Sequence, residues 1–368
     1  MSGARRVTGR REERRTTGGA EYGVTVRRRP FRWRLWLVAI GVTSAGVLTL
    51  VAWPGSQSPV RPAAAHRAGG AVRHASEPVT APVTPGAQQV SPPAPGTTPP
   101  PTFAVQTETI RLDDPARLTP ARGVIPATQG RVLVTDLFVP SGAPGALPLV
   151  VFAHGWNSDP GVYAALLTRW AQAGFLVAAP VFPDSTDVYP GSPVSDYADQ
   201  ALDISFVITA LLHSDTVLVD PTRIAVAGHS DGGTDVALLA LDPAYADARV
   251  RAYLSLSGEL PSGVAPYTAS PVNASLLVAV GSADEYGLYP RATEVFDAAQ
   301  VPAKVMVVEQ GGDHLGSFVG ATAAAAAMRE ETTTFLELAL EPHPPTTAAL
   351  VAALQDPAAP ELSVVAPG

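Results

Sequence analysis

Ser230 lies in the glycine-rich run Gly228-His229-Ser230-Asp231-Gly232-Gly233. A serine hydroxyl is a poor nucleophile unless a base removes its proton and hydrogen-bond donors stabilise the oxyanion that forms. The pattern G-x-S-x-G holds a serine on a sharp turn between a strand and a helix, where the glycines supply the room that the turn needs. In a chain with 32 glycines the run alone is weak evidence, so it needs an acid and a base in the expected order.

The acid that orients the base is expected directly after a later strand. The apolar run from Leu276 to Val280 predicts such a strand, and the sequence Gly-Ser-Ala-Asp-Glu follows it. We therefore predict Asp284 as the acid. Glu285 is the neighbouring alternative, and a loop carboxylate that caps the helix after Pro290 is a third interpretation.

The base must be a histidine that follows Asp284, which leaves His314 and His343. His343 lies among prolines near the end of the chain. His314 follows another predicted strand in the glycine-flanked loop Gln-Gly-Gly-Asp-His-Leu-Gly, which can bring an imidazole close to Ser230. We predict His314 as the general base.

Two backbone N–H groups, those of Asp231 and Trp156, are expected to bind the oxyanion. Asp231 directly follows the nucleophile, and Trp156 ends the run Phe-Ala-His-Gly-Trp after a further predicted strand. His154 in that run is expected to order the loop by hydrogen bonding rather than to catalyse. The Trp156 ring has two interpretations, a wall of the acyl pocket or a core aromatic.

The elements that must position these residues lie between residues 103 and 341. Apolar, β-branched runs alternate there with helical stretches, which predicts an α/β domain with a mostly parallel sheet and helices on both faces. The expected strands are 131–139, 149–153, 175–180, 223–227, 250–256, 276–280 and 304–308, and the expected helices are 162–173, 196–212, 233–241, 292–300 and 321–340. The short loop between 256 and 276 is too small for a large cap domain, so an open site is expected.

The sequence before this domain predicts a membrane anchor. Residues 1–34 form a basic segment with 11 Arg and 3 Glu, and residues 35–53 are apolar and uncharged. At ~1.5 Å per residue the apolar run spans about 28 Å as a helix, enough to cross the hydrocarbon core. The arginines predict a cytoplasmic N-terminus and an extracytoplasmic catalytic domain. A cleaved signal peptide, which would release a secreted protein, is the alternative.

Two further segments are rich in proline and alanine. Residues 54–102 are expected to form a disordered linker that holds the domain away from the bilayer, and residues 342–368 a disordered tail. The chain has no cysteine, which excludes disulfides, a thiolate nucleophile and a thiolate metal site. No nucleic-acid partner, cofactor or metal is expected, and the oligomeric state stays open.

The region from about Phe103 to Leu340 resembles the α/β-hydrolases grouped with dienelactone hydrolases, platelet-activating-factor acetylhydrolases, chlorophyllases and the bacterial cutinase-like polyester hydrolases. The resemblance is carried by HGW at 154–156, GHSDGG at 228–233, GSADE at 281–285 and GGDHLG at 311–316. It implies an α/β-hydrolase fold, a triad of Ser230, Asp284 and His314, and oxyanion donors at Trp156 and Asp231. Two departures argue against a narrow activity: dienelactone hydrolases use a cysteine, and polyester hydrolases usually carry Met where this chain has Asp231.

These features predict a membrane-anchored, extracytoplasmic serine carboxylic-ester hydrolase that works through an acyl-enzyme intermediate. A small-molecule or surface-presented ester is the expected substrate. A cell-envelope acyltransferase or peptidase with the same triad is one alternative. A non-catalytic envelope module on a hydrolase scaffold is the other.

Overall fold

The computed structural model describes residues 24–26, 102–123, 125–186, 196–261, 273–355 and 357–367. The predicted membrane span at 35–53 lies outside the described residues, as does the predicted linker up to residue 101. Within the ranges that are described, no helix is both long and apolar enough to cross a membrane.

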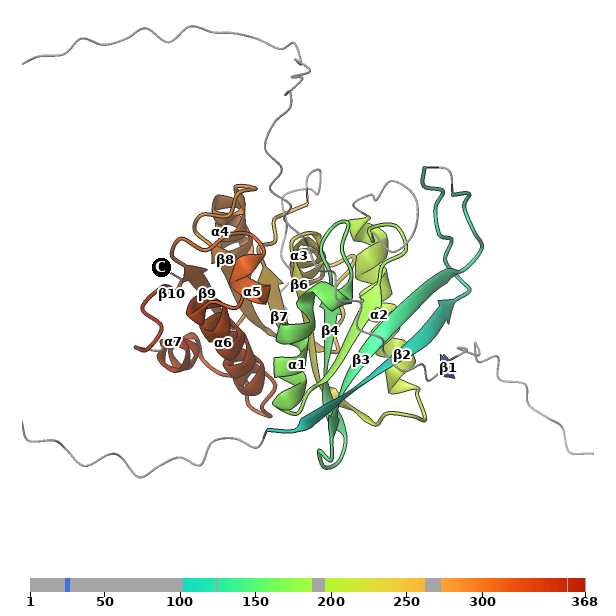
Figure 1. Ribbon diagram of the computed structural model, residues 1–368, viewed down its shortest axis with the longest axis horizontal. Coiled ribbons are helices and arrows are strands. Elements are labelled where there is room, and N and C mark those ends of the chain that lie inside the picture. Colours follow the sequence, from blue (N-terminus) through green and yellow to red (C-terminus); the bar gives the residue numbers. More distant parts are fainter. Residues whose placement is uncertain are drawn as a thin grey trace, which may run out of the picture. The chain divides into compact units, whose positions relative to one another are not determined.

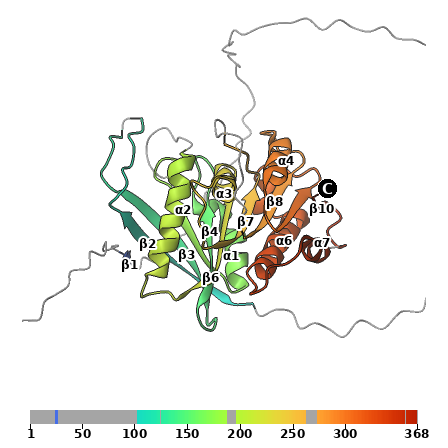
Figure 2. The same ribbon diagram turned by 180° about the vertical axis from the view of Figure 1, so that it is seen from behind.

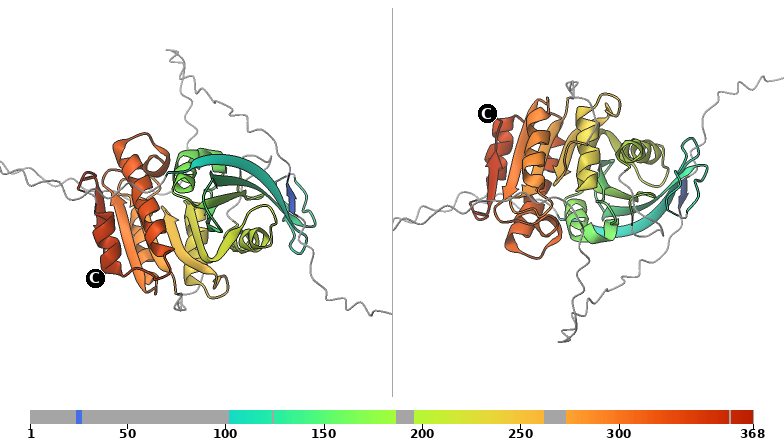
Figure 3. Two further views of the ribbon diagram at one scale, coloured as in Figure 1. Left: turned by 90° about the horizontal axis from the view of Figure 1, so that it is seen from below. Right: turned by 90° about the horizontal axis from the view of Figure 1, so that it is seen from above.

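In the described part of the chain, ten strands form a mixed sheet in the order β1-β2-β3-β5-β4-β6-β7-β8-β9-β10 (Figure 1). The central strands β4 to β9 pair in parallel, whereas β1, β2, β3 and β10 pair antiparallel with their neighbours. Figure 3 shows how strongly β2 curves at its margin of the sheet. The strands are β1 (Val24–Val26), β2 (Ala104–Asp114), β3 (Arg131–Ser141), β4 (Leu147–Ala153), β5 (Leu176–Val181), β6 (Val219–His229), β7 (Val250–Leu256), β8 (Ser275–Gly281), β9 (Ala303–Glu309) and β10 (Leu362–Val365).

Helices cover both faces of the sheet. Figure 1 shows α1, α6 and α7 in front of it, and Figure 2 shows α2 on the other face. The helices are η1 (Pro160–Tyr163), α1 (Ala164–Gln172), α2 (Tyr197–Leu212), α3 (Asp231–Leu241), α4 (Leu288–Ala298), α5 (Gly316–Val319), α6 (Ala323–Ala339) and α7 (Thr347–Leu354).

The central strands are apolar throughout because each of their faces is buried. In β4, Val151 belongs to the core under α2, α3 and α4, whereas its neighbours Val150 and Phe152 belong to the core under α1, α6 and α7. Successive side chains of a strand point to opposite faces. The continuous apolar runs in the sequence therefore predicted these strands correctly.

The margins of the sheet differ from the sequence-based expectation. β2 was not predicted, because its outward residues are polar and its run Ala-Val-Gln-Thr-Glu-Thr lacks a continuous apolar stretch. The segment 342–368, expected to be a disordered tail, instead contains α7 and β10. β10 pairs antiparallel with β9, and Leu350 and Leu354 of α7 are buried in the core.

β1 comes from the segment that the sequence analysis assigns to the cytoplasm. It pairs antiparallel with β2, with Val24 opposite Leu112 and Val26 opposite Ile110. A strand that pairs with β2 must lie on the same side of a membrane as the domain. This pairing and an inserted span at 35–53 therefore exclude each other within one molecule.

Candidate active site

Ser230 lies on a sharp turn between β6 and α3. Its φ is 58° and its ψ is −121°, a strained conformation for a residue with a side chain. Close packing explains the glycines around it, because a Cβ at Gly228 would lie 2.1 Å from the carbonyl oxygen of Gly232. A Cβ at Gly232 would lie 2.1 Å from that of Ala153. The predicted strand, turn and helix around the serine are therefore present.

Asp284 and His314 follow two neighbouring parallel strands, β8 and β9. The carboxyl ends of parallel strands meet at one edge of the sheet, which brings the two loops together. His314 Nδ1 lies 2.8 Å from Asp284 Oδ2, and the Asp284 side chain is fully buried. The carboxylate therefore accepts from Nδ1–H and leaves Nε2 as the ring nitrogen that can take a proton.

Glu285, the alternative acid, has a different contact. Its Oε2 accepts a hydrogen bond of 3.0 Å from the backbone N–H of His314, and this bond lowers the pKa of the exposed Glu285 carboxyl. Glu285 thus holds the backbone of the histidine, whereas Asp284 contacts the ring. His314 also lines the same cleft as Ser230, whereas His343 does not.

A cleft of about 750 Å³ is lined by the predicted nucleophile Ser230, the predicted base His314 and the two predicted oxyanion residues Trp156 and Asp231. Trp156 and Tyr286 are exposed at 51% and 70% in it, so the interpretation of Trp156 as a core aromatic is wrong. Among the described residues no group of three or more His, Asp or Glu side chains could hold a metal ion. The lining residues are Gly155, Trp156, Asn157, Ser158, Val162, Tyr163, His229, Ser230, Asp231, Glu259, Glu285, Tyr286, Leu288, Arg291, His314 and Leu315.

His154 orders the loop that carries Trp156, as predicted. Its Nδ1 lies 2.8 Å from the carbonyl oxygen of Gly155 and its Nε2 lies 3.0 Å from the backbone N–H of Phe182. Nδ1 must therefore carry the proton and Nε2 must accept. Burial lowers the pKa of His154 to about 4, so the ring is neutral at physiological pH.

The orientation of one peptide plane follows from this contact. In a trans peptide the C=O and the following N–H point in opposite directions. Because His154 binds the carbonyl of Gly155, the N–H of Trp156 points away from His154 and is available to another acceptor. Asp231 is the first residue of α3, and an N–H in the first turn of a helix has no acceptor within the helix.

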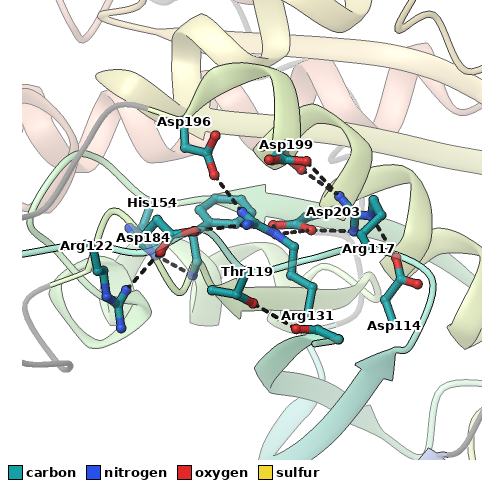
Figure 4. Close-up of polar contacts among 12 residues, drawn as sticks. Asp114, Arg117, Thr119, Arg122, Arg131, His154, Asp184, Asp196, Asp199 and Asp203 are labelled. Carbon is teal, nitrogen blue, oxygen red and sulfur yellow. Dashed lines mark hydrogen bonds and ion pairs between the residues drawn. The ribbon is translucent and has the colours of Figure 1, made fainter. Parts of the chain in front are cut away.

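A buried ionic cluster, made of Arg131, Asp184, Asp196 and Asp203, supports the loops behind the cleft (Figure 4). The Arg131 guanidinium lies 2.8 Å from Asp203 and 3.0 Å from both Asp184 and Asp196. Burial raises the pKa of Asp203 and of Asp196 to about 6, and Arg131 opposes that rise. This cluster was not predicted from the sequence, because its charges come from β3, the loop after β5, the N-cap of α2 and the second turn of that helix.

The cluster reaches the candidate site along the backbone. The backbone carbonyl of Ser185, which follows Asp184, accepts a hydrogen bond of 2.7 Å from the backbone N–H of Asn157. Asn157 is the residue after Trp156. Tyr197, next to Asp196, donates from its hydroxyl to Asp231 Oδ1 over 3.2 Å. Both expected oxyanion donors therefore have neighbours tied to this cluster.

A mixed, mostly parallel sheet covered by helices, with a serine on a turn between strand and helix, defines the α/β-hydrolase fold. The sequence model of the chlorophyllase family matches residues 125–258. The structure is also similar to that of a ferulic acid esterase from Streptomyces cinnamoneus, with a TM-score of 0.56 and 21% identity over 74% of this chain and 98% of that chain. Comparison with curated proteins gives no match.

The predicted resemblance to α/β-hydrolases of the serine-esterase group is confirmed by the chlorophyllase match and the fold. The protein is accordingly a carboxylic-ester hydrolase of the serine type. The matched residues include Ser230, Trp156 and Asp231 but end before Asp284 and His314.

Proposed function

We propose that the protein hydrolyses carboxylic esters through a triad of Ser230, His314 and Asp284. The observation that carries the proposal is the 2.8 Å contact between His314 Nδ1 and the buried Asp284 carboxylate, beside a cleft that both Ser230 and His314 line. A buried carboxylate holds the imidazole in the tautomer that accepts a proton at Nε2. Ser230 and His314 then supply a nucleophile and its base.

The reaction runs in two halves. Ser230 Oγ attacks the ester carbonyl carbon while His314 Nε2 takes the hydroxyl proton, and the N–H groups of Trp156 and Asp231 bind the oxyanion. The tetrahedral adduct breaks its C–O bond to the leaving alcohol, which takes the proton from His314. Water then attacks the acyl carbon and gives a proton to His314 Nε2. The second tetrahedral adduct breaks its C–O bond to Ser230 Oγ, which takes this proton back from His314, and the carboxylic acid leaves.

The open cleft and its aromatic side chains favour short or surface-presented esters. Trp156 and Tyr286 are exposed beside the reacting serine, and flat aromatic faces bind flat aromatic groups well. The structural similarity to a ferulic acid esterase supports including aromatic acyl esters among the substrates. We therefore rank short aliphatic and aromatic acyl esters above long-chain lipids.

Ser230→Ala tests the proposal. Wild-type protein should hydrolyse p-nitrophenyl acetate and react with a fluorophosphonate probe, and Ser230→Ala should lose both activities. Ser214→Ala, which changes a partly exposed serine after α2, is the matched control and should retain both. More than a few per cent of wild-type turnover in Ser230→Ala would exclude this serine as the nucleophile.

The proposal extends to location: an uncleaved span at 35–53 anchors the protein, with its domain outside the cytoplasm. The apolar run and its flanking arginines support this topology. It requires that β1 does not pair with β2 in the inserted protein. A protease added to intact cells should cleave the domain from the membrane fraction, and a protected domain would overturn the topology. Recovery of the intact domain in the medium would favour the cleaved signal peptide.

A further inference from the structure

His229 and Tyr163 lie between the oxyanion loop and the loop of the base, and the reaction above uses neither. His229 is the last residue of β6, directly before Ser230, and Tyr163 is the last residue of η1. Each side chain is about 1% exposed. Two buried polar groups that touch the site on opposite sides need partners, because an unpaired buried polar group is costly.

Their hydrogen bonds form one continuous chain. The N–H of Gly155 donates to the Tyr163 hydroxyl over 3.2 Å, and this hydroxyl lies 2.9 Å from His229 Nδ1. His229 Nε2 lies 2.8 Å from the backbone carbonyl oxygen of His314. This series of hydrogen bonds therefore begins at Gly155, one residue before Trp156, and ends on the backbone of His314, the proposed base.

The direction of each bond is determined by chemistry. A carbonyl oxygen can only accept, so His229 must carry its proton on Nε2 and accept on Nδ1. The Tyr163 hydroxyl must then donate to Nδ1, while its oxygen accepts from the N–H of Gly155. Burial, with a contribution from His314, lowers the pKa of His229 to about 3, so this arrangement persists at physiological pH.

Both ends of the chain are held from other sides as well. At one end, Glu285 accepts from the His314 N–H and Asp284 accepts from its ring. His229 binds the third polar group of that residue, its carbonyl. At the other end, His154 Nδ1–H donates to the carbonyl of Gly155, and the Gly155 N–H donates to the Tyr163 hydroxyl, so both backbone polar groups of this residue are bonded.

We propose that Tyr163 and His229 are positioning residues that couple the oxyanion loop to the loop of His314. The inference rests on the proposed triad. A displacement of about 1 Å in a catalytic group can lower a rate by about 100-fold, so a hydrogen-bonded link between the two loops has a direct effect on turnover. Tyr163 and His229 border the cleft but are only about 1% exposed, so they offer a bound ester little contact and their loss should lower kcat rather than raise KM.

Three variants interrupt this series of hydrogen bonds, two of them at the bond between Tyr163 and His229 and one at the bond between His229 and His314. Tyr163→Phe removes the hydroxyl and keeps the ring, which packs 4.8 Å from Phe152. His229→Gln reaches the carbonyl of His314 but offers Tyr163 no acceptor at Nδ1. His229→Asn offers Tyr163 an acceptor but is too short to reach His314. We expect each to lower kcat about ten-fold, with KM within about two-fold of wild type, which corresponds to the loss of one buried hydrogen bond.

The decisive measurement is a pair of double variants, each kcat being normalised to the fraction of protein that a fluorophosphonate probe labels. Tyr163→Phe removes the bonds to Gly155 and to His229, and the second of these is the bond that His229→Gln breaks, so their combination should be little worse than Tyr163→Phe alone. Tyr163→Phe and His229→Asn break different bonds, so their combination should be worse than either. The affinity for a boronic acid, which mimics the tetrahedral adduct, should fall in step with kcat/KM.

Tyr253→Phe is the control, because the buried Tyr253 hydroxyl on β7 has no hydrogen-bond partner among the described residues. It should leave kcat unchanged. Single variants at 163 and 229 that keep more than half of wild-type kcat would overturn the coupling, as would effects that multiply in the Tyr163→Phe/His229→Gln pair. Wild-type protein that fails to react with the probe would instead refute the proposed triad, and the coupling with it.

Discussion

The Nε of Arg131 lies 2.8 Å from both carboxylate oxygens of Asp203 in the core of the protein. Both side chains are completely buried, and the pair joins β3 to α2. Burial of two charges is tolerated only when each is paired and hydrogen-bonded. The same guanidinium also contacts Asp184 and Asp196, while Arg117 and Arg122 supply further positive charge to Asp203 and Asp184.

Replacing Arg131 with Met should destabilise the protein strongly. The change leaves Asp203 and Asp184 buried without their main counter-charge, and removal of one partner of a buried pair costs about 3–5 kcal/mol. The free energy of unfolding in urea at neutral pH checks this. Arg111→Ala is the control, since Arg111 pairs with Asp113 at the surface and such pairs contribute about 0–1 kcal/mol. Equal effects of the two changes would contradict the structural role of the cluster.

Replacing Asp235 with Asn should stabilise the protein above about pH 5. Both Asp235 oxygens are buried and have no hydrogen-bond partner among the described residues, and burial raises its pKa well above the ordinary value. The folded state therefore binds a proton that the unfolded chain releases near its usual pKa of about 3.9. The stability of the wild type must then fall as the pH rises from about 4 through the folded-state pKa.

The pH dependence of unfolding distinguishes this effect from simple repacking. Asparagine cannot ionise, so Asp235→Asn should match the wild type near pH 4 and exceed it by an amount that grows toward pH 8. Thermal melts at several pH values measure the difference. A constant offset between the two proteins at all pH values would show that ionisation of Asp235 has no part in it.

Asp284→Asn and Glu285→Gln should have very different effects on turnover. An amide at 284 would present its NH₂ or C=O to His314 and disturb the tautomer, a change that costs about 10⁴-fold in kcat in serine-hydrolase triads. Glu285 accepts from the backbone N–H of His314 and does not contact its ring, so Glu285→Gln should cost less than about 10-fold. Steady-state kinetics with p-nitrophenyl acetate compare them, and a greater loss in the Glu285 variant would reverse the assignment of the acid.

The charge of the cleft should discriminate between esters. Among the described residues that line it, Asp231, Glu259 and Glu285 are acidic and Arg291 is the one arginine or lysine, which pairs with Glu259 over 2.5 Å. A cleft with an excess of negative charge attracts cations and repels anions, and salt screens the effect. We expect kcat/KM at low salt to be about ten-fold higher for a short ester with a trimethylammonium group than for one with a sulfonate.

Ionic strength and one variant test the origin of this preference. Raising the salt to about 0.5 M should bring the two kcat/KM values together, while a neutral ester of the same size should change little. Glu259→Gln releases Arg291 from its partner and should favour the sulfonate. A preference that is insensitive to both changes would show that shape, and not charge, selects the substrate.

Much of the fold was predictable because its signals are local. Seven strands of the sheet coincide with apolar runs, and five helices follow from the spacing between them. β2 was not predicted because a strand near the edge of the sheet has one polar face. α7 and β10 were not predicted because their segment is rich in alanine and proline and has few buried side chains. The hydrogen bonds of β10 to β9 and the burial of Leu350 are gained only in the folded chain.

The sequence by itself determined the order of nucleophile, acid and base, and the turn that presents Ser230, because each depends on residues that are neighbours in the chain. Only the tertiary structure decided which groups hold them. The hydroxyl of Tyr163 meets a ring 66 positions later in the sequence, and that ring meets the backbone of a residue 85 positions later still. Arg131 meets Asp203 across 72 positions. Such contacts arise from the order of parallel strands and the packing of helices on the sheet, for which a single sequence carries no local signal.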